Sequence, residues 1–167
     1  MMDVRVVRAD VHEPASPAVN DCVVFAGPPF HMIEMVVEVD GDEVAYIRGD
    51  GVIVATPSGS TAHNLAAGGP ILEPTGEAFI LTSICPQALS YRPLVLAASR
   101  RISIRIAQAN PGTTVATDGR IVQPLQVGDR ILISRYNADF LLVRNPRHSE
   151  WHALRRKPRW GEAPNMH

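Results

Sequence analysis

The residues best suited to chemistry in this sequence lie in a stretch of small and hydroxyl-bearing side chains, "TPSGSTAHNLAAGGP", residues 56–70. It follows the apolar run "GVIVA" directly. The free N–H groups at the start of a helix, beside side chains this small, let a ligand approach the backbone closely. A strand-to-helix turn with no ligand explains the same residues equally well, so the stretch alone does not establish a site.

Two phosphate-binding motifs are excluded for this stretch. A Walker A loop needs a lysine after its glycines, and the single lysine of the chain is Lys157, far from it. The G-x-G-x-x-G fingerprint of dinucleotide-binding folds is absent, and no alternation of strands and helices surrounds the stretch. Any ligand must therefore be held in another way.

The elements around the stretch read mostly as short strands. Several alternate apolar and polar residues with period two, as half-buried antiparallel strands do, and turn residues such as Asp40-Gly41 and Asp118-Gly119 separate them. We expect strands within residues 3–11, 21–27, 32–40, 43–49, 51–55, 78–83, 93–98, 101–107, 113–118, 120–125, 129–136 and 139–144. Residues 60–67 read as one short helix, stopped by Gly68-Gly69. The pattern predicts a mainly β fold, a distorted antiparallel β-sandwich with one short helix.

Composition and charge narrow the class of protein. The chain has 167 residues, 46% of them hydrophobic, and a net charge of −1, which suits one domain over residues 1–145 followed by a basic tail, residues 146–167. No signal peptide or membrane-spanning run is recognisable, so we expect a cytoplasmic protein without membrane association. A nucleic-acid partner is not expected, because few aromatic residues accompany the basic tail. The two cysteines suggest neither a disulfide framework nor a zinc site.

A longer block changes the interpretation of the opening stretch. "RGDGVIVATPSGSTAHNLAAGGPILEP", residues 48–74, closely resembles the signature of NAD kinases. Further blocks agree in the same order along the chain: "AVNDCVVF", "ICPQALSYRPLVL", "TDGR" and "LRRKPRW". The resemblance covers nearly the whole chain, but it concerns the C-terminal, NAD-binding domain of that family. The G-G-D-G motif of the family's N-terminal α/β domain does not occur in this sequence.

The resemblance implies that Asn20 and Asp21 hold the adenosine half of NAD. An amide offers both a donor and an acceptor to the adenine edge, and a carboxylate can accept two ribose hydroxyls. Outside the family context the same pair would be an Asx turn before a strand. Asp50 matches the family aspartate at the nicotinamide end, where a carboxylate favours the positively charged ring.

Other positions of the block match family residues that line the same pocket. Ser58, Thr61 and Ala62 match the loop that holds adenine, and a short residue at 62 leaves room for the ring. His63 stands where tyrosine is usual and Ala66 where serine is usual, which puts affinity and cofactor discrimination in question. Two further residues match positions that border the pocket, the later one often supplied by a neighbouring subunit, and a turn or surface-pair role stays open for both: Arg48 and Asp118.

The resemblance implies an NAD kinase, which phosphorylates the 2′-hydroxyl of the adenosine ribose of NAD with ATP or polyphosphate, using a divalent metal such as Mg²⁺, to give NADP. This chain would supply the NAD-binding half, with no catalytic residue and no metal ligand of its own, and would be inactive without the G-G-D-G domain. We expect a dimer or tetramer. The alternatives are a non-catalytic NAD(P)-binding or oligomerisation module, and a related lipid kinase domain.

Overall fold

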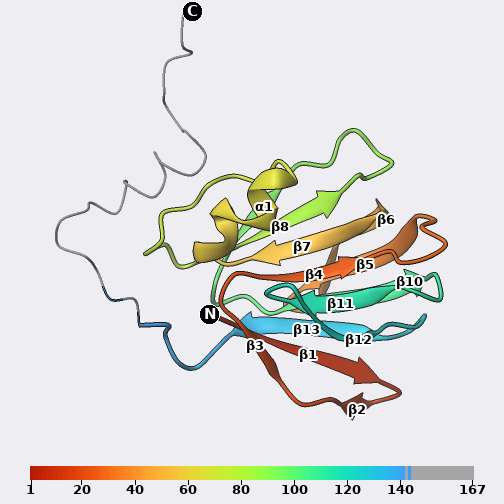
Figure 1. Ribbon diagram of the computed structural model, residues 1–167, viewed down its shortest axis with the longest axis horizontal. Helices are drawn as coiled ribbons and strands as arrows, with labels where there is room; N and C mark the ends of the chain where they lie inside the picture. Colours follow the sequence, from red (N-terminus) through yellow and green to blue (C-terminus); the bar gives the residue numbers. More distant parts are fainter. Residues whose placement is uncertain (142, 144–167) are drawn as a thin grey trace, which may run out of the picture.

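The strands form two antiparallel sheets in the computed structural model, which describes residues 1–141 and 143 (Figure 1). Sheet A has the order β2-β1-β13-β10-β5-β6, with β3 also paired to β1, and sheet B the order β12-β11-β4-β7-β8-β9. The strands of sheet A are β1 (Met2–Arg8), β2 (Val11–His12), β3 (Ser16–Ala18), β5 (Ile33–Val39), β6 (Asp42–Gly49), β10 (Ile102–Gln108) and β13 (Arg130–Arg135). Those of sheet B are β4 (Asp21–Phe25), β7 (Gly51–Ala55), β8 (Ala78–Ile84), β9 (Leu94–Ala97), β11 (Thr114–Thr117) and β12 (Arg120–Pro124).

The main core lies between the two sheets and is built from alternate residues of their strands. Sheet A contributes side chains such as Val4, Met35 and Ile104, and sheet B contributes side chains such as Val24 and Val54, all buried. Because strand side chains alternate between faces, the residues between these point outward from each sheet. The predicted mainly β, antiparallel sandwich is therefore confirmed.

Two hairpin turns fall where the sequence predicted them, whereas the turn at Ala9 and Asp10 between β1 and β2 interrupts the strand expected over residues 3–11. Asp40 and Gly41 join β5 to β6, and Asp118 and Gly119 join β11 to β12. All four residues have positive φ, a conformation that glycine adopts freely and aspartate tolerates better than most residues. The turn chemistry thus sets the register of both hairpins.

The helical segment after β7 differs from the prediction of one continuous helix over residues 60–67. A 3₁₀ turn η1 (Ser58–Thr61) is followed by a four-residue helix α1 (His63–Ala66), and Ala62 between them leaves helical geometry with φ −98° and ψ −127°. The Ser60 hydroxyl donates to Pro57 O and accepts from the Leu72 N–H. Such side-chain to backbone bonds compete with helix formation and explain the break.

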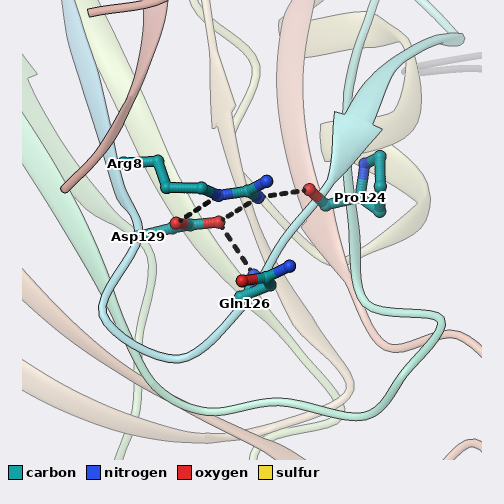
Figure 2. Close-up of polar contacts among 4 residues, drawn as sticks. All are labelled: Arg8, Pro124, Gln126 and Asp129. Carbon is teal, nitrogen blue, oxygen red and sulfur yellow. Dashed lines mark hydrogen bonds and ion pairs between the residues drawn. The ribbon is translucent and has the colours of Figure 1, made fainter. Parts of the chain in front are cut away.

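A partly buried ion pair fastens the end of β1 to the turn before β13 (Figure 2). Arg8 Nε donates to Asp129 Oδ1 at 2.9 Å and Arg8 Nη2 to Asp129 Oδ2 at 2.6 Å, while Nη2 also reaches Pro124 O. Asp129 Oδ2 accepts the Gln126 N–H as well. Burial alone would raise the pKa of Asp129, but these bonds outweigh it, and the pKa lies below the usual value.

A strand over residues 139–144 and a basic tail over residues 146–167 were both predicted, and the structure tests only the strand. The strand expected over residues 139–144 is wrong, because residues 139–141 and 143 form no strand. Phe140, Leu141 and Val143 are exposed there instead of packed, so these apolar side chains have no sheet to join within the described residues. The basic tail predicted over residues 146–167 lies outside the described residues. Along the part that is described, no helix is long and apolar enough to cross a membrane.

Candidate functional site

A cavity of about 820 Å³ opens on the outer face of sheet B. The η1 and α1 segment covers one half of that face, over β7 and β8, as Figure 1 shows. There a second apolar cluster is buried, with Ile53, Ala55 and Ile80 beneath Ala67 and Leu72. No described residue covers the other half, over β4, β11 and β12, in this way, and this half forms the floor of the cavity.

The cavity floor follows β4 from one end to the other. Asp21, Val23 and Phe25 alternate along the strand, share its outer face and all line the cavity. Gly51 pairs with both Phe25 and Ile84, and a Cβ at Gly51 would lie 2.2 Å from the Val24 carbonyl oxygen. Only glycine fits this position, which lies between Phe25 and Ile84 in the sheet.

The polar end of the cavity is formed by Asn20 and Asp21, whose backbone is held from two sides. Asp118 Oδ1 accepts the N–H of Asn20 at 2.7 Å and that of Asp21 at 3.2 Å, and Oδ2 accepts the Val19 N–H at 2.8 Å. The Asp118 N–H in turn donates to Asp21 O. The Asp118 carboxylate therefore borders the cavity while it fixes the segment that precedes β4.

The opening stretch holds the same segment from the other side. Thr56 donates its hydroxyl to Val19 O at 2.6 Å, accepts the Gly59 N–H, and donates its own N–H to Asn20 O. A Cβ at Gly59 would lie 2.0 Å from Asn20 O, so the close approach requires glycine. Part of the "TPSG" sequence is thus explained by the positioning of Asn20.

The Asp21 carboxyl of the cavity has a shifted pKa. Its side chain is buried, and burial raises the pKa of Asp21 above the ordinary aspartate value. The nearby His63 acts in the opposite direction and Asp118 adds to the rise. A buried carboxylate with open acceptor capacity is suited to take hydroxyl donors from a ligand.

Asn64, on α1, stabilises the helical segment beside the cavity through buried hydrogen bonds. Its Nδ2 donates to Ser60 O at 3.1 Å and to Pro70 O at 3.0 Å, and its Oδ1 accepts the Thr82 hydroxyl at 2.7 Å. A Cβ at Gly69 would lie 2.0 Å from Asn64 Oδ1, which explains a glycine there. The side chain is fully buried and holds η1, α1 and β8 together.

Asp50 stands at the opposite end of the cavity from Asp21. Its N–H donates to Ile84 O at 3.0 Å and its O accepts the Ala26 N–H at 2.8 Å, so its backbone is fixed between β8 and the end of β4. Asp50 lines the cavity together with Phe25 and Phe30. This end is apolar apart from one carboxylate.

The structure brings together six of the ten residues predicted from sequence. Those that line the cavity are Asn20, Asp21, Asp50, Ala62, His63 and Asp118. The other four lie beside it: Arg48 lies near the end of β6 and forms an ion pair with Glu34 at 3.6 Å, and exposed positions of η1 and α1 carry Ser58, Thr61 and Ala66. Their contact with a ligand stays a prediction.

The sequence analysis missed the apolar residues of the cavity. The alternation of Asp21, Val23 and Phe25 could have placed all three on one face, but nothing in the sequence marks Ile84, Phe30 or Ile121 as their neighbours. Within the described residues, no group of three or more His, Cys, Asp or Glu side chains is arranged to hold a metal ion. Cys22 is buried, Cys85 is exposed, and both are free thiols.

The fold and the cavity define a two-sheet domain suited to an elongated ligand, with polar groups at one end and aromatic groups at the other. Comparison with known proteins identifies the family. The model of the ATP-NAD kinase C-terminal domain matches residues 19–145. The chain belongs to this family.

Two relatives show how much of such a protein the chain represents. It is 39% identical over 160 residues to an NAD kinase of Rhodopirellula baltica, covering 96% of this chain and 51% of the relative. It is 41% identical over 158 residues to an NAD kinase of Symbiobacterium thermophilum, covering 94% and 56%. The chain thus spans about half the length of the curated relatives it matches.

Two solved structures are similar in fold as well as in sequence. A yeast NADH kinase complexed with NADH has a TM-score of 0.75 and 34% identity, covering 80% of this chain and 39% of the yeast chain. An Archaeoglobus fulgidus NAD kinase in complex with ATP has a TM-score of 0.64 and 35% identity, covering 82% of this chain and 52% of the archaeal one. Both likenesses support the same family assignment.

Proposed function

We propose that this chain is the NAD-binding half of an NAD kinase. The observation that carries the proposal is the cavity on sheet B, which collects Asn20, Asp21 and Asp50 on one face, each at a position that matches the family's sequence motif. In this proposal the Asn20 amide pairs with the adenine edge and the Asp21 carboxylate accepts ribose hydroxyls. Ala62 is small enough for the adenine ring to approach the backbone, and Asp50 faces the nicotinamide end.

The proposed reaction moves the γ-phosphoryl group of ATP to the 2′-oxygen of the adenosine ribose. The 2′-hydroxyl proton leaves to a base, and the products are NADP and ADP. Such transfers depend on alignment of the acceptor oxygen and on neutralisation of phosphate charge, for which Mg²⁺ is expected to enter with ATP. This chain's residues would hold the acceptor, and the base and most ATP contacts would come from a G-G-D-G half such as the family contains. Polyphosphate in place of ATP stays a second donor to test, and the cytoplasm is the expected location.

We also propose that the domain associates with itself as a dimer or tetramer. The outer strands of sheet B support this, since β12 carries Ile121, which is 70% exposed, and β9 carries the exposed Leu94 and Val95. Edge strands with exposed apolar residues pair readily with other chains. A strictly monomeric mass by light scattering at high micromolar concentration would contradict this proposal.

A binding and turnover experiment tests the main proposal. Saturation-transfer NMR on the purified 167-residue chain should detect NAD, with weaker transfer to the adenine protons in Asn20→Ala. The same chain should form no NADP from NAD and ATP until a family G-G-D-G half is supplied. A folded chain that shows no NAD contact would overturn the proposal. NADP formation by the chain alone would contradict only the assignment of the base and the ATP contacts to a G-G-D-G half. Asp50 and Asp21 would then be the first bases to examine.

A further inference from the structure

The cavity has two chemically different ends, separated by the length of β4. Asp21 and Phe25 are four residues apart, which is about 13 Å along a strand at roughly 3.3 Å per residue. Asn20, His63 and Asp118 surround the Asp21 end, whereas Ala26, Phe30, Asp50 and Ile84 surround the Phe25 end. A ligand that fills both ends must present a polar group to the first and a flat, apolar group to the second.

Phe30 is the residue at the second end that the fold does not explain. The residue is 71% exposed although it borders the cavity, and its backbone has φ 61°, which is unfavourable for a bulky side chain. Residues kept in such conformations cluster at ligand sites, where the cost is offset by function. A phenylalanine that is both exposed and in a disfavoured conformation contributes little to stability, so its role is better sought in binding.

The backbone around Phe30 is well anchored. The Phe30 N–H donates to Gly27 O at 2.7 Å, and Asn110 Nδ2 donates to His31 O at 2.6 Å. The Gly112 N–H donates to Pro28 O at 3.2 Å. These contacts tie the loop to the segment between β10 and β11, so the aromatic side chain is presented at the rim of the cavity from a fixed base.

The charges around the cavity favour a cation over a neutral or anionic ring. Among the described residues that line it are three carboxylates, Asp21, Asp50 and Asp118, and no Lys or Arg. Aromatic faces carry negative charge density and attract cations as well. The Phe25 end, with Asp50 beside two phenyl rings, therefore matches a planar cation.

We propose that Phe30 is a specificity-determining residue that makes this site prefer the oxidised, positively charged pyridinium ring of a nicotinamide dinucleotide to the neutral reduced ring. The inference rests on the proposed function, because it assumes that the nicotinamide ring occupies the Phe25 end. The pyridinium ring is flat and cationic, and it gains both stacking on Phe30 and attraction to Asp50. The dihydropyridine ring is neutral and gains only the apolar contact.

The test measures the dissociation constants of NAD and NADH for the folded 167-residue chain by NMR titration, for the native protein and two variants. We expect NAD to bind more tightly than NADH. Phe30→Ala should weaken NAD about threefold to fivefold, the range of an exposed cation–π contact, with a smaller effect on NADH. Phe30→Tyr keeps an aromatic face and should retain the preference. Val127→Ala, which truncates an exposed side chain that does not line the cavity, is the matched control.

The outcomes separate this inference from the proposed function. Equal loss of NAD and NADH affinity in Phe30→Ala, or no loss of either, overturns the role of Phe30 while NAD binding still supports the proposed function. A native chain that binds both forms equally also overturns it. A folded chain that binds neither overturns the proposed function and this inference together. Nicotinamide mononucleotide as a smaller probe should respond to Phe30→Ala, whereas AMP should not.

Discussion

Asp118 and Asn20 are joined by a hydrogen bond of 2.7 Å from the Asn20 N–H to Asp118 Oδ1, although they lie 98 residues apart in the sequence. Asp118 occupies the tip of the β11–β12 hairpin, and its other oxygen accepts the Val19 N–H. The carboxylate is therefore engaged by backbone donors, which directs its function toward positioning Asn20 and Asp21.

Replacing Asp118 with alanine should weaken NAD binding about tenfold, because it releases three backbone N–H groups that hold Asn20 and Asp21 in place, at about 1 kcal/mol or more of positioning energy. NMR titration gives the affinity, and amide hydrogen exchange should show faster exchange at Val19 and Asn20. Asp42→Ala, on the exposed β5–β6 hairpin, serves as the control. Slow exchange and native affinity in folded Asp118→Ala would refute the positioning role.

A larger side chain at position 62 should block the cavity, since Ala62 lines it. We expect Ala62→Leu to weaken NAD binding by roughly tenfold or more while the melting temperature stays near native, because the side chain is exposed and each factor of ten is about 1.4 kcal/mol. Ala15→Leu makes the same change at an exposed position that does not line the cavity, and serves as the matched control. Native affinity in both variants would mean that the wall near Ala62 does not contact the ligand.

Asn64 should matter for stability more than any exposed residue of the same segment. Asn64→Ala leaves the Ser60 and Pro70 carbonyls and the Thr82 hydroxyl without their partner, so we expect a loss of about 2–3 kcal/mol in the free energy of unfolding. Thr82→Val removes one of these bonds and should cost about 1 kcal/mol. Urea denaturation measures both. The double variant should lose less than the sum, and a strictly additive result would argue against a shared network.

The Arg8–Asp129 pair should make stability depend on acid. Since the folded pKa of Asp129 lies below its unfolded value, the contribution is complete above the unfolded value, near 3.8, and is lost as the pH falls through the folded pKa. Arg8→Met should cost about 2 kcal/mol at pH 7, a moderate figure because the Arg8 side chain is 39% exposed. Urea midpoints at pH 7, 4 and 3 check this. The native-to-variant difference should shrink in acid, and a constant difference would contradict the ion-pair explanation.

The Asp21 carboxyl should make NAD binding depend on pH. Its effect on folding stability should have the opposite sign to that of Asp129. Its raised pKa means that the folded state binds a proton more readily, so folding stability falls as the pH rises from 3.8 through the folded pKa, while the ionised form needed for ribose hydroxyls appears. NAD affinity should therefore decrease when the pH is lowered toward this pKa. The Asp21→Asn variant should bind NAD weakly, and its NAD affinity should not change with pH between about pH 7 and 4.5. A native chain with flat affinity across the range would disprove the role of Asp21.

The local pattern of the sequence determined most of the secondary structure. Period-two alternation located most strands of both sheets, although it ran β1 and β2 together and missed β3. The Asp-Gly pairs located two hairpin turns, because turn geometry depends on neighbouring residues. The strand expected at residues 139–144 failed for the complementary reason. Its apolar side chains fit a strand locally, but within the described residues they have no sheet to pair with, and a strand cannot form alone.

The candidate site divides in the same way. The resemblance to the NAD kinase family predicted one site for Asn20, Asp21, Asp50, Ala62 and His63. Their side-chain types indicated what each could bind. Only the tertiary structure decided that the Asp118 carboxylate is occupied by backbone N–H groups and that Thr56 and Gly59 hold the Asn20 backbone from the other side. It also decided that Phe25 and Phe30 form an aromatic end beside Asp50. Such relationships join strands that are distant in sequence, and their geometry arises from sheet pairing and packing, which no local pattern encodes.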